Sequence, residues 1–210
     1  MKLNVTHLAA TFLLGLIAAA CHAQDFSADV VYLAAGKPEA PTAGTGTSTR
    51  SSKLYVSKDK MRLETRGVSE TVLLVNRGEH TAIALFPARK SYQSLASGPS
   101  QYFRVENADD ACPDWENAAD RKIVCEKVGP EEVEGRQTVK YQNKGALQAA
   151  VAAVWIDSAL KFVVKWEEAD TGAELRNIQE GQQAADLFNV PSGYKILSPQ
   201  KATSKGFSKK

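Results

Sequence analysis

The feature that most constrains this chain is a short alternation of apolar and polar residues, the period of two expected for half-buried β-strands. Met61, Leu63 and Thr65 alternate with Arg62 and Glu64. Extended runs of this kind are predicted at residues 26–32, 54–57, 60–66, 72–75, 81–86, 91–95, 138–141, 152–156 and 162–167. The chain is therefore expected to be mainly β.

Turn-forming clusters separate these runs, at residues 57–60, 76–79 and 170–172. Their regular spacing predicts antiparallel hairpins in a sandwich, a barrel or a curved sheet, and not alternating strand-helix units. Helix is expected only as a turn or two in residues 97–107 and a short helix in residues 180–188. We expect a single domain over residues 24–197, with a long flexible loop at residues 36–49.

The N-terminal segment is typical of a secretory signal peptide. An apolar run from Leu8 to Ala20 is followed by Cys21-His22-Ala23, a small-x-small cleavage site. Cleavage after Ala23 would export the protein to the periplasm or secrete it. A lipid anchor at Cys21 is the alternative, and it is less favoured because Ala18, not leucine, precedes that cysteine at the usual position.

The charge of the chain is nearly balanced, with 26 Lys and Arg against 24 Asp and Glu. This balance argues against a nucleic-acid-binding protein, which normally presents a strongly basic surface. Residues 198–210 carry four lysines and one large apolar residue, and they are predicted to form a disordered basic tail.

Two cysteines remain after removal of the signal segment. Cys112 and Cys125 lie close together in an exported chain, so an intrachain disulfide is the expectation. A zinc pair is the rival interpretation, but no histidine or further cysteine stands nearby to complete four ligands.

Catalytic motifs are scarce. His80 would be the only histidine of the mature chain, and no Gly-x-Ser-x-Gly nucleophile motif is present. A calcium site is an open alternative for the polar loop, although its spacing differs from an EF-hand. The carboxylates of that loop are Asp109, Asp110, Asp114, Glu116 and Asp120. No cofactor or metal is expected, and the protein is not expected to be an enzyme.

Binding is the function class that remains. Residues 72–75 and 154–156 are apolar on both faces, so a sheet wrapped partly around short helices, with an apolar groove, is consistent with the pattern. The candidate lining residues for a ligand are large and mostly aromatic: Tyr32, Tyr55, Met61, Leu63, Trp155, Phe162 and Trp166.

Several runs resemble periplasmic lipoprotein-carrier-like proteins, the LolA/LolB-like superfamily. They are residues 52–64 (SKLYVSKDKMRLE), 71–78 (TVLLVNRG), 86–92 (FPARKSY), 154–157 (VWID) and 162–167 (FVVKWE). The subgroup that is most similar consists of uncharacterised exported bacterial proteins. The resemblance implies an incomplete antiparallel β-barrel with helices over its concave face. It also implies non-catalytic binding of acyl chains or other lipidic ligands. The disulfide loop and residues 36–49 are additions to the simplest carrier pattern.

The sequence thus predicts an exported, non-catalytic, monomeric protein that binds an apolar or amphipathic ligand by burial of apolar surface. A protein partner in the cell envelope is also compatible with this interpretation. Two alternatives stay open. One is a structural or interaction module of the envelope without a small ligand, and the other is a hydrolase that uses carboxylates such as Glu64, Glu167 and Glu174.

Overall fold

The computed structural model describes residues 25–34, 37–38, 51–67, 69–96, 104–118, 123–145, 152–168 and 171–197. The predicted signal peptide (residues 1–23) and basic tail (residues 198–210) lie outside the described residues. Most of the predicted loop at residues 36–49 also lies outside them.

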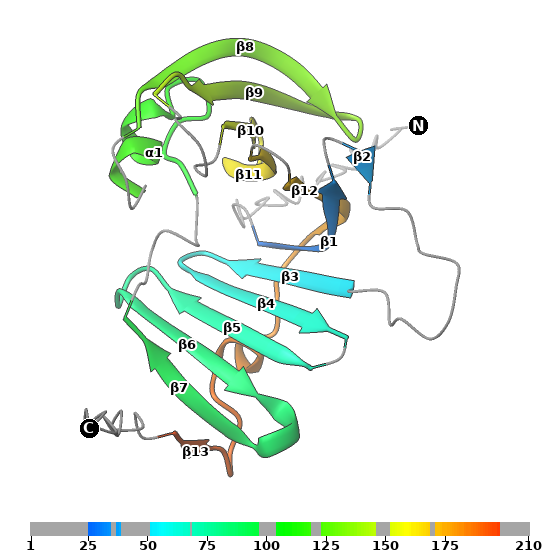
Figure 1. Ribbon diagram of the computed structural model, residues 1–210, viewed down its shortest axis with the longest axis vertical. Helices are drawn as coiled ribbons and strands as arrows, with labels where there is room; N and C mark the ends of the chain where they lie inside the picture. The colour runs from blue at the N-terminus through cyan, green and yellow to red at the C-terminus, as the bar shows by residue number, and fades with distance from the viewer. Residues whose placement is uncertain are drawn as a thin grey trace, which may run out of the picture.

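The described residues are mostly strand, as the alternation predicts (Figure 1). The strands are β1 (Phe26–Ala34), β2 (Lys37–Pro38), β3 (Ser51–Ser57), β4 (Lys60–Arg66), β5 (Thr71–Asn76), β6 (Thr81–Phe86), β7 (Ser91–Leu95), β8 (Cys125–Val133), β9 (Arg136–Asn143), β10 (Ala153–Asp157), β11 (Phe162–Glu167), β12 (Thr171–Glu180) and β13 (Lys195–Ile196). The helical elements are α1 (Cys112–Ala118) and two 3-10 turns, η1 (Pro87–Arg89) and η3 (Ala185–Phe188).

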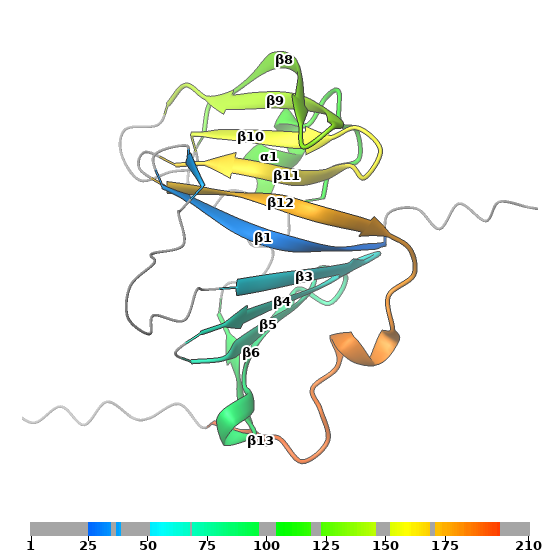
Figure 2. The ribbon, with the colours of Figure 1, turned by 90° about the vertical axis from the view of Figure 1, so that its right-hand side faces the viewer.

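Within the described residues these thirteen strands form one sheet. The order is β13-β7-β6-β5-β4-β3-β1-β12-β11-β10-β9-β8, and β2 pairs with β1. Neighbouring strands are antiparallel except β13, which pairs with β7 in parallel. The end strands β13 and β8 do not pair with each other, so the sheet is open, and it bends strongly along its length (Figure 2).

Short turns set the register of the hairpins. Lys58 and Asp59 connect β3 to β4, and Lys58 adopts φ 45°. This turn pairs Val56 with Met61 and, two residues further on, Leu54 with Leu63. Because side chains alternate across a strand, apolar residues of consecutive strands meet on one side of the sheet. We call this side the inner face and the opposite side the outer face.

The bend encloses the inner face. Buried residues of β1, β3, β4, β11 and β12 belong to one apolar cluster, and Phe26 packs edge-to-face on Phe162 with ring centroids 5.3 Å apart. Arg104 links distant parts of the sheet, because its Nη1 donates to Leu160 O (3.3 Å) while its own carbonyl accepts from Arg77 Nη1 (3.4 Å). The β5–β6 and β10–β11 turns are thereby held near each other.

A disulfide-linked segment covers the inner face at β9–β11. Cys112 in α1 is bonded to Cys125 at the start of β8, as the sequence predicts, and Trp115 of α1 is buried among side chains of β9 and β10. The Tyr141 hydroxyl donates to Ala108 O (2.8 Å) and accepts from Ala111 N (3.2 Å). Burial raises the pKa of the Tyr141 phenol.

The C-terminal segment crosses the outer face of β4–β7. Val190 and Tyr194 pack on the apolar residues of β5 and β6, and Arg62 Nη1 donates to Leu187 O (2.8 Å). The chain then adds β13 to the edge of β7, where Leu197 N donates to Tyr92 O (2.7 Å).

These contacts correct parts of the prediction. The predicted mainly β fold with a curved, incompletely closed sheet is observed as one open, bent sheet, whereas a general cover of helices over its concave face is not confirmed. The one described α-helix lies at the β8–β11 end of the sheet, and η3 lies against β4 on the outer face. The helix predicted at residues 180–188 is wrong in its first half, because Glu180 still pairs with Phe26 in the sheet. Strand β8 was not predicted.

Candidate ligand-binding face

The inner face of β3–β6 is built from rows of side chains that are aligned across the strands. The deepest row joins Val56, Met61, Val75 and Ala82, which are direct neighbours in the pairing. All four are buried, with at most 4% of each residue exposed. This row is the floor of the apolar cluster.

The next row is also apolar but is open to solvent. It joins Leu54, Leu63, Leu73 and Ala84, in which only Leu54 is buried and the other three are half-buried. Rows of one face lie two residues apart along a strand, or about 7 Å. Apolar surface therefore becomes accessible one step away from the floor.

The third row carries hydroxyl groups. Ser52, Thr65 and Thr71 are neighbours across β3, β4 and β5, and the Tyr32 hydroxyl shares a hydrogen bond with Ser52 Oγ (3.3 Å). The inner face thus changes from buried apolar, through accessible apolar, to polar along the strands.

The aromatic residues Tyr32 and Trp166 extend this face onto β1 and β11. Ala173 of β12 pairs with both of them, so the three residues form a row. Tyr32 and Trp166 are half-buried and pack on the apolar cluster. Gly172 permits the close approach of β12 to β11, because a Cβ there would lie 2.6 Å from Trp166 O.

The structure brings together five of the seven predicted lining residues. Tyr32, Met61, Leu63, Phe162 and Trp166 all belong to the inner cluster or pack directly on it. The sequence reasoning missed Leu73 and the hydroxyl row. The two-residue turn at Lys58 and Asp59 is a signal that could have paired Ser52 of β3 with Thr65 of β4 in the hydroxyl row.

Tyr55 and Trp155 lie on the outer face instead. Tyr55 alternates with Leu54 and Val56 and pairs with Arg62, so the period of two directs it away from the cluster. The same parity separates Trp155 from Val154 and Ile156.

Trp155 is covered by charged side chains. Lys140 Nζ and Lys165 Nζ lie 4.4 Å and 4.3 Å from the ring centroid, and Trp155 Nε1 donates to Glu131 Oε2 (2.7 Å). These cation–π contacts and the hydrogen bond leave the residue 2% exposed. Trp155 is therefore packed within the outer face and does not join the other aromatic residues.

The carboxylates considered for hydrolysis also lie on the outer face, each beside a cation. Glu64 is paired with Arg62 (2.7 Å between Oε1 and Nε), Glu167 with Lys165 (3.0 Å), and Glu174 with Arg176. Each carboxylate thus pairs with a cation of its own strand, and the three carboxylates do not come together on the inner face.

The acidic loop uses its carboxylates for backbone and lysine contacts. Asp114 Oδ2 accepts from Glu106 N (2.9 Å), Glu116 Oε1 accepts from Cys125 N (3.2 Å), and Asp109 pairs with Lys127 (3.3 Å). In the described parts of the chain, no three His, Cys, Asp or Glu side chains are grouped as metal ligands would be. Asp120 lies outside the described residues.

His80 is an exposed turn residue with φ 52°. No described helix has the length and apolar character that crossing a membrane requires.

Solved structures that resemble this chain share its sheet architecture. An uncharacterized conserved protein from Thermus thermophilus superposes with a TM-score of 0.52 at 9% identity, over 83% of this chain and 90% of that protein. This similarity supports a common fold.

Two further matches have lower TM-scores and carry no functional argument. MucB matches with a TM-score of 0.46 at 14% identity over 82% of this chain, which spans only 59% of MucB. A putative outer membrane lipoprotein-sorting protein domain from Vibrio parahaemolyticus matches with a TM-score of 0.34 at 13% identity, over 78% of this chain and 89% of that domain. No family model and no curated protein sequence match the chain.

Proposed function

We propose that the protein is an exported, non-catalytic binding module of the cell envelope whose inner face takes an amphipathic ligand with an acyl chain. The observation that carries this proposal is the accessible apolar row on the inner face, in which Leu63 and Leu73 are half-buried beside a fully buried floor. Covering apolar surface stabilises a complex by about 25 cal/mol per Å² before the costs of association are subtracted.

The order of the rows favours an amphipathic over a purely apolar ligand. An acyl chain that lies along Leu63 and Leu73 would place its polar end at Thr65 and Thr71, which offer hydroxyl groups. Tyr32 and Trp166, whose rings each carry one polar group, would lie near the polar end of the ligand. The ligand would therefore bind in one direction.

Export is the remaining part of the proposal. The signal-like residues 1–23, the absence of a catalytic motif and the disulfide support a periplasmic or secreted binding protein with cleavage after Ala23. We propose that the domain spans residues 24–197 and acts as a monomer.

The test is a titration of the full-length exported protein with a fluorescent polyene fatty acid. The variant Leu63→Gln/Leu73→Gln places amides on the accessible row, and we expect its affinity to fall by about tenfold or more, which corresponds to a free-energy loss of about 1.4 kcal/mol. The matched control is Ile83→Gln, a half-buried residue of β6 on the outer face, which should bind the fatty acid like the unchanged protein.

Absence of fatty-acid binding by the unchanged protein would overturn the proposal. An equal loss in Leu63→Gln/Leu73→Gln and Ile83→Gln would do so as well, because it would show that the inner face is not specific. Mass spectrometry of protein purified from its host under native conditions gives an independent result. A bound lipid supports the proposal, whereas an empty protein that carries a partner chain favours an interaction module.

A further inference from the structure

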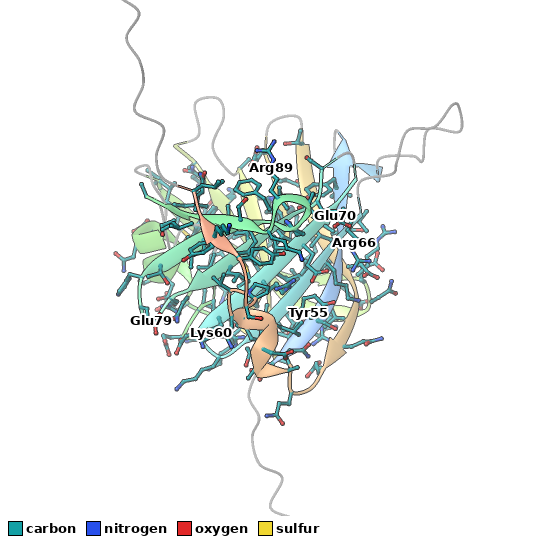
Figure 3. All side chains as sticks on the ribbon, turned by 90° about the horizontal axis from the view of Figure 1, so that it is seen from below. Tyr55, Lys60, Arg66, Glu70, Glu79 and Arg89 are labelled. Carbon is teal, nitrogen blue, oxygen red and sulfur yellow. A yellow bond between two sulfur atoms is a disulfide. The ribbon has the colours of Figure 1, made fainter. Side chains whose placement is uncertain are left out.

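A second recess lies on the outer face at the turn end of β3–β6. The β3–β4 turn, the β5–β6 turn and residues 182–188 line a half-open recess of about 490 Å³, which we call the turn-end pocket. Lys60 and Glu79 are on this side of the molecule in Figure 3, away from Glu70 and Arg66. The volume falls within the range of about 300–1,000 Å³ that is usual for small-molecule sites.

Hydrogen bonds fix the turns that form one wall of the pocket. The Asp25 carboxylate accepts from Ser57 Oγ (2.8 Å) and from Lys58 N (2.9 Å). Arg77 N donates to Asp59 O (2.8 Å), which joins the β5–β6 turn to the β3–β4 turn. This wall is therefore ordered before any ligand arrives.

The opposite wall is tied to the same framework. Gly181 N donates to Asp25 O (2.8 Å), and Arg62 Nη1 donates to Leu187 O (2.8 Å). Residues 182–188 are held at both ends over the outer face. The backbone around the pocket is thus held in place from both sides.

Several polar side chains of the pocket have no internal partner. Asp59, Lys60, Glu79 and Gln182 line it, and within the described residues none of them makes a side-chain hydrogen bond or an ion pair. Phe188, which is half-buried, adds an apolar surface. The pocket therefore offers acceptors, donors and an aromatic ring together.

This mixture of carboxylates, ammonium groups, amides and an aromatic ring favours a ligand that both donates and accepts hydrogen bonds. An anion would meet the carboxylates of Asp59 and Glu79, and an apolar ligand would remove water from these charges without replacing their hydrogen bonds. A sugar hydroxyl both donates and accepts, so one saccharide can satisfy carboxylates, an ammonium group and an amide at once. The C–H face of a sugar ring suits the Phe188 ring. We propose that the turn-end pocket binds a neutral saccharide, independently of the inner face.

The test measures backbone amide chemical shifts of the isotope-labelled protein during titration with maltotriose, cellotriose and tri-N-acetylchitotriose. Each sugar is raised to about 10 mM, where a Kd near 1 mM still gives high occupancy. We expect at least one of them to shift amides of residues 57–60, 76–79 and 182–188. Asp59→Asn/Glu79→Gln should weaken that binding by about tenfold, which corresponds to about 1.4 kcal/mol.

Glu70→Gln is the matched control, since Glu70 is an exposed carboxylate that is not part of the pocket. It should bind the sugar like the unchanged protein, and so should Leu63→Gln/Leu73→Gln, which separates this proposal from acyl-chain binding. The proposal is overturned if none of the three sugars shifts the pocket amides. It is also overturned if Asp59→Asn/Glu79→Gln binds like Glu70→Gln.

Discussion

The inner face of the bent sheet is covered in one half of the sheet and partly accessible to solvent in the other. At β9–β11 the face is covered by residues 104–118, which include α1. Tyr141, Val154 and Ile156 are almost completely buried there. At β4–β6 one row is buried and the next remains accessible at Leu63 and Leu73. The comparison teaches that the chain itself closes one half of the face, whereas the other half keeps accessible apolar surface.

The largest expected difference between the halves is in core packing. Ile156→Ala should lower the free energy of unfolding by about 3 kcal/mol, because a fully buried side chain leaves a cavity. Leu63→Ala should cost only about 1 kcal/mol, because solvent already reaches that side chain. Urea unfolding of both variants measures the difference. Equal losses would contradict the division into a closed and an open half.

The disulfide is expected to stabilise the closed half specifically. Cys112→Ser/Cys125→Ser should lower the free energy of unfolding by about 3 kcal/mol in the chain-entropy model, since the bond closes a loop with a sequence separation of 13. Fatty-acid binding at the open half should persist under conditions in which the variant stays folded. Loss of binding by a folded variant would show that the two halves are coupled.

The smallest expected effect is a dependence on alkaline pH in the closed half. The folded state raises the pKa of Tyr141, so its neutral phenol is favoured by folding. The contribution of the neutral phenol to the free energy of unfolding is fully present below the unfolded pKa of about 10. It is lost as the pH rises above that value and through the folded pKa.

Tyr141→Phe removes this titration. The difference in unfolding free energy between the unchanged protein and Tyr141→Phe should therefore shrink between about pH 8 and about pH 11, as measured by urea unfolding at each pH. A difference that stays constant over this range would mean that the phenol is not protected by the closed half.

Much of the sheet could be predicted because several of its strands, such as β4, alternate between apolar and polar residues and are bounded by short turns. The β3–β4 hairpin follows from apolar residues on both sides of a two-residue turn, and the observed pairing of Leu54 with Leu63 is the result. Strand β8 lacks that signal. Its residues are mostly exposed and include Gly129 and Pro130, so its position depends on pairing with β9 and on the disulfide.

The candidate site could be predicted in part. Large apolar residues were recognised as a group, but the assignment of Tyr55 and Trp155 to that group ignored strand parity, which places both on the outer face. The contacts of Lys140 and Lys165 with Trp155 depend on the register of the three consecutive strands β9, β10 and β11, which shifts between Trp155 and Ile156. The turn-end pocket depends on the path of residues 182–188, for which the sequence predicts helix, whereas the structure has an irregular segment that leads into η3.

Strand β8 ends the described sheet, and its sequence limits what can attach there. The register of β8 against β9 shifts between Lys127 and Gly129, and Pro130 that follows has no amide hydrogen to donate. Charged residues at Glu126, Lys127 and Glu132 would meet like charges if a second copy paired side by side in register. An irregular, charged edge strand of this kind discourages the edge-to-edge pairing that leads to fibrils. At the opposite edge of the sheet, the short strand β13 pairs with β7.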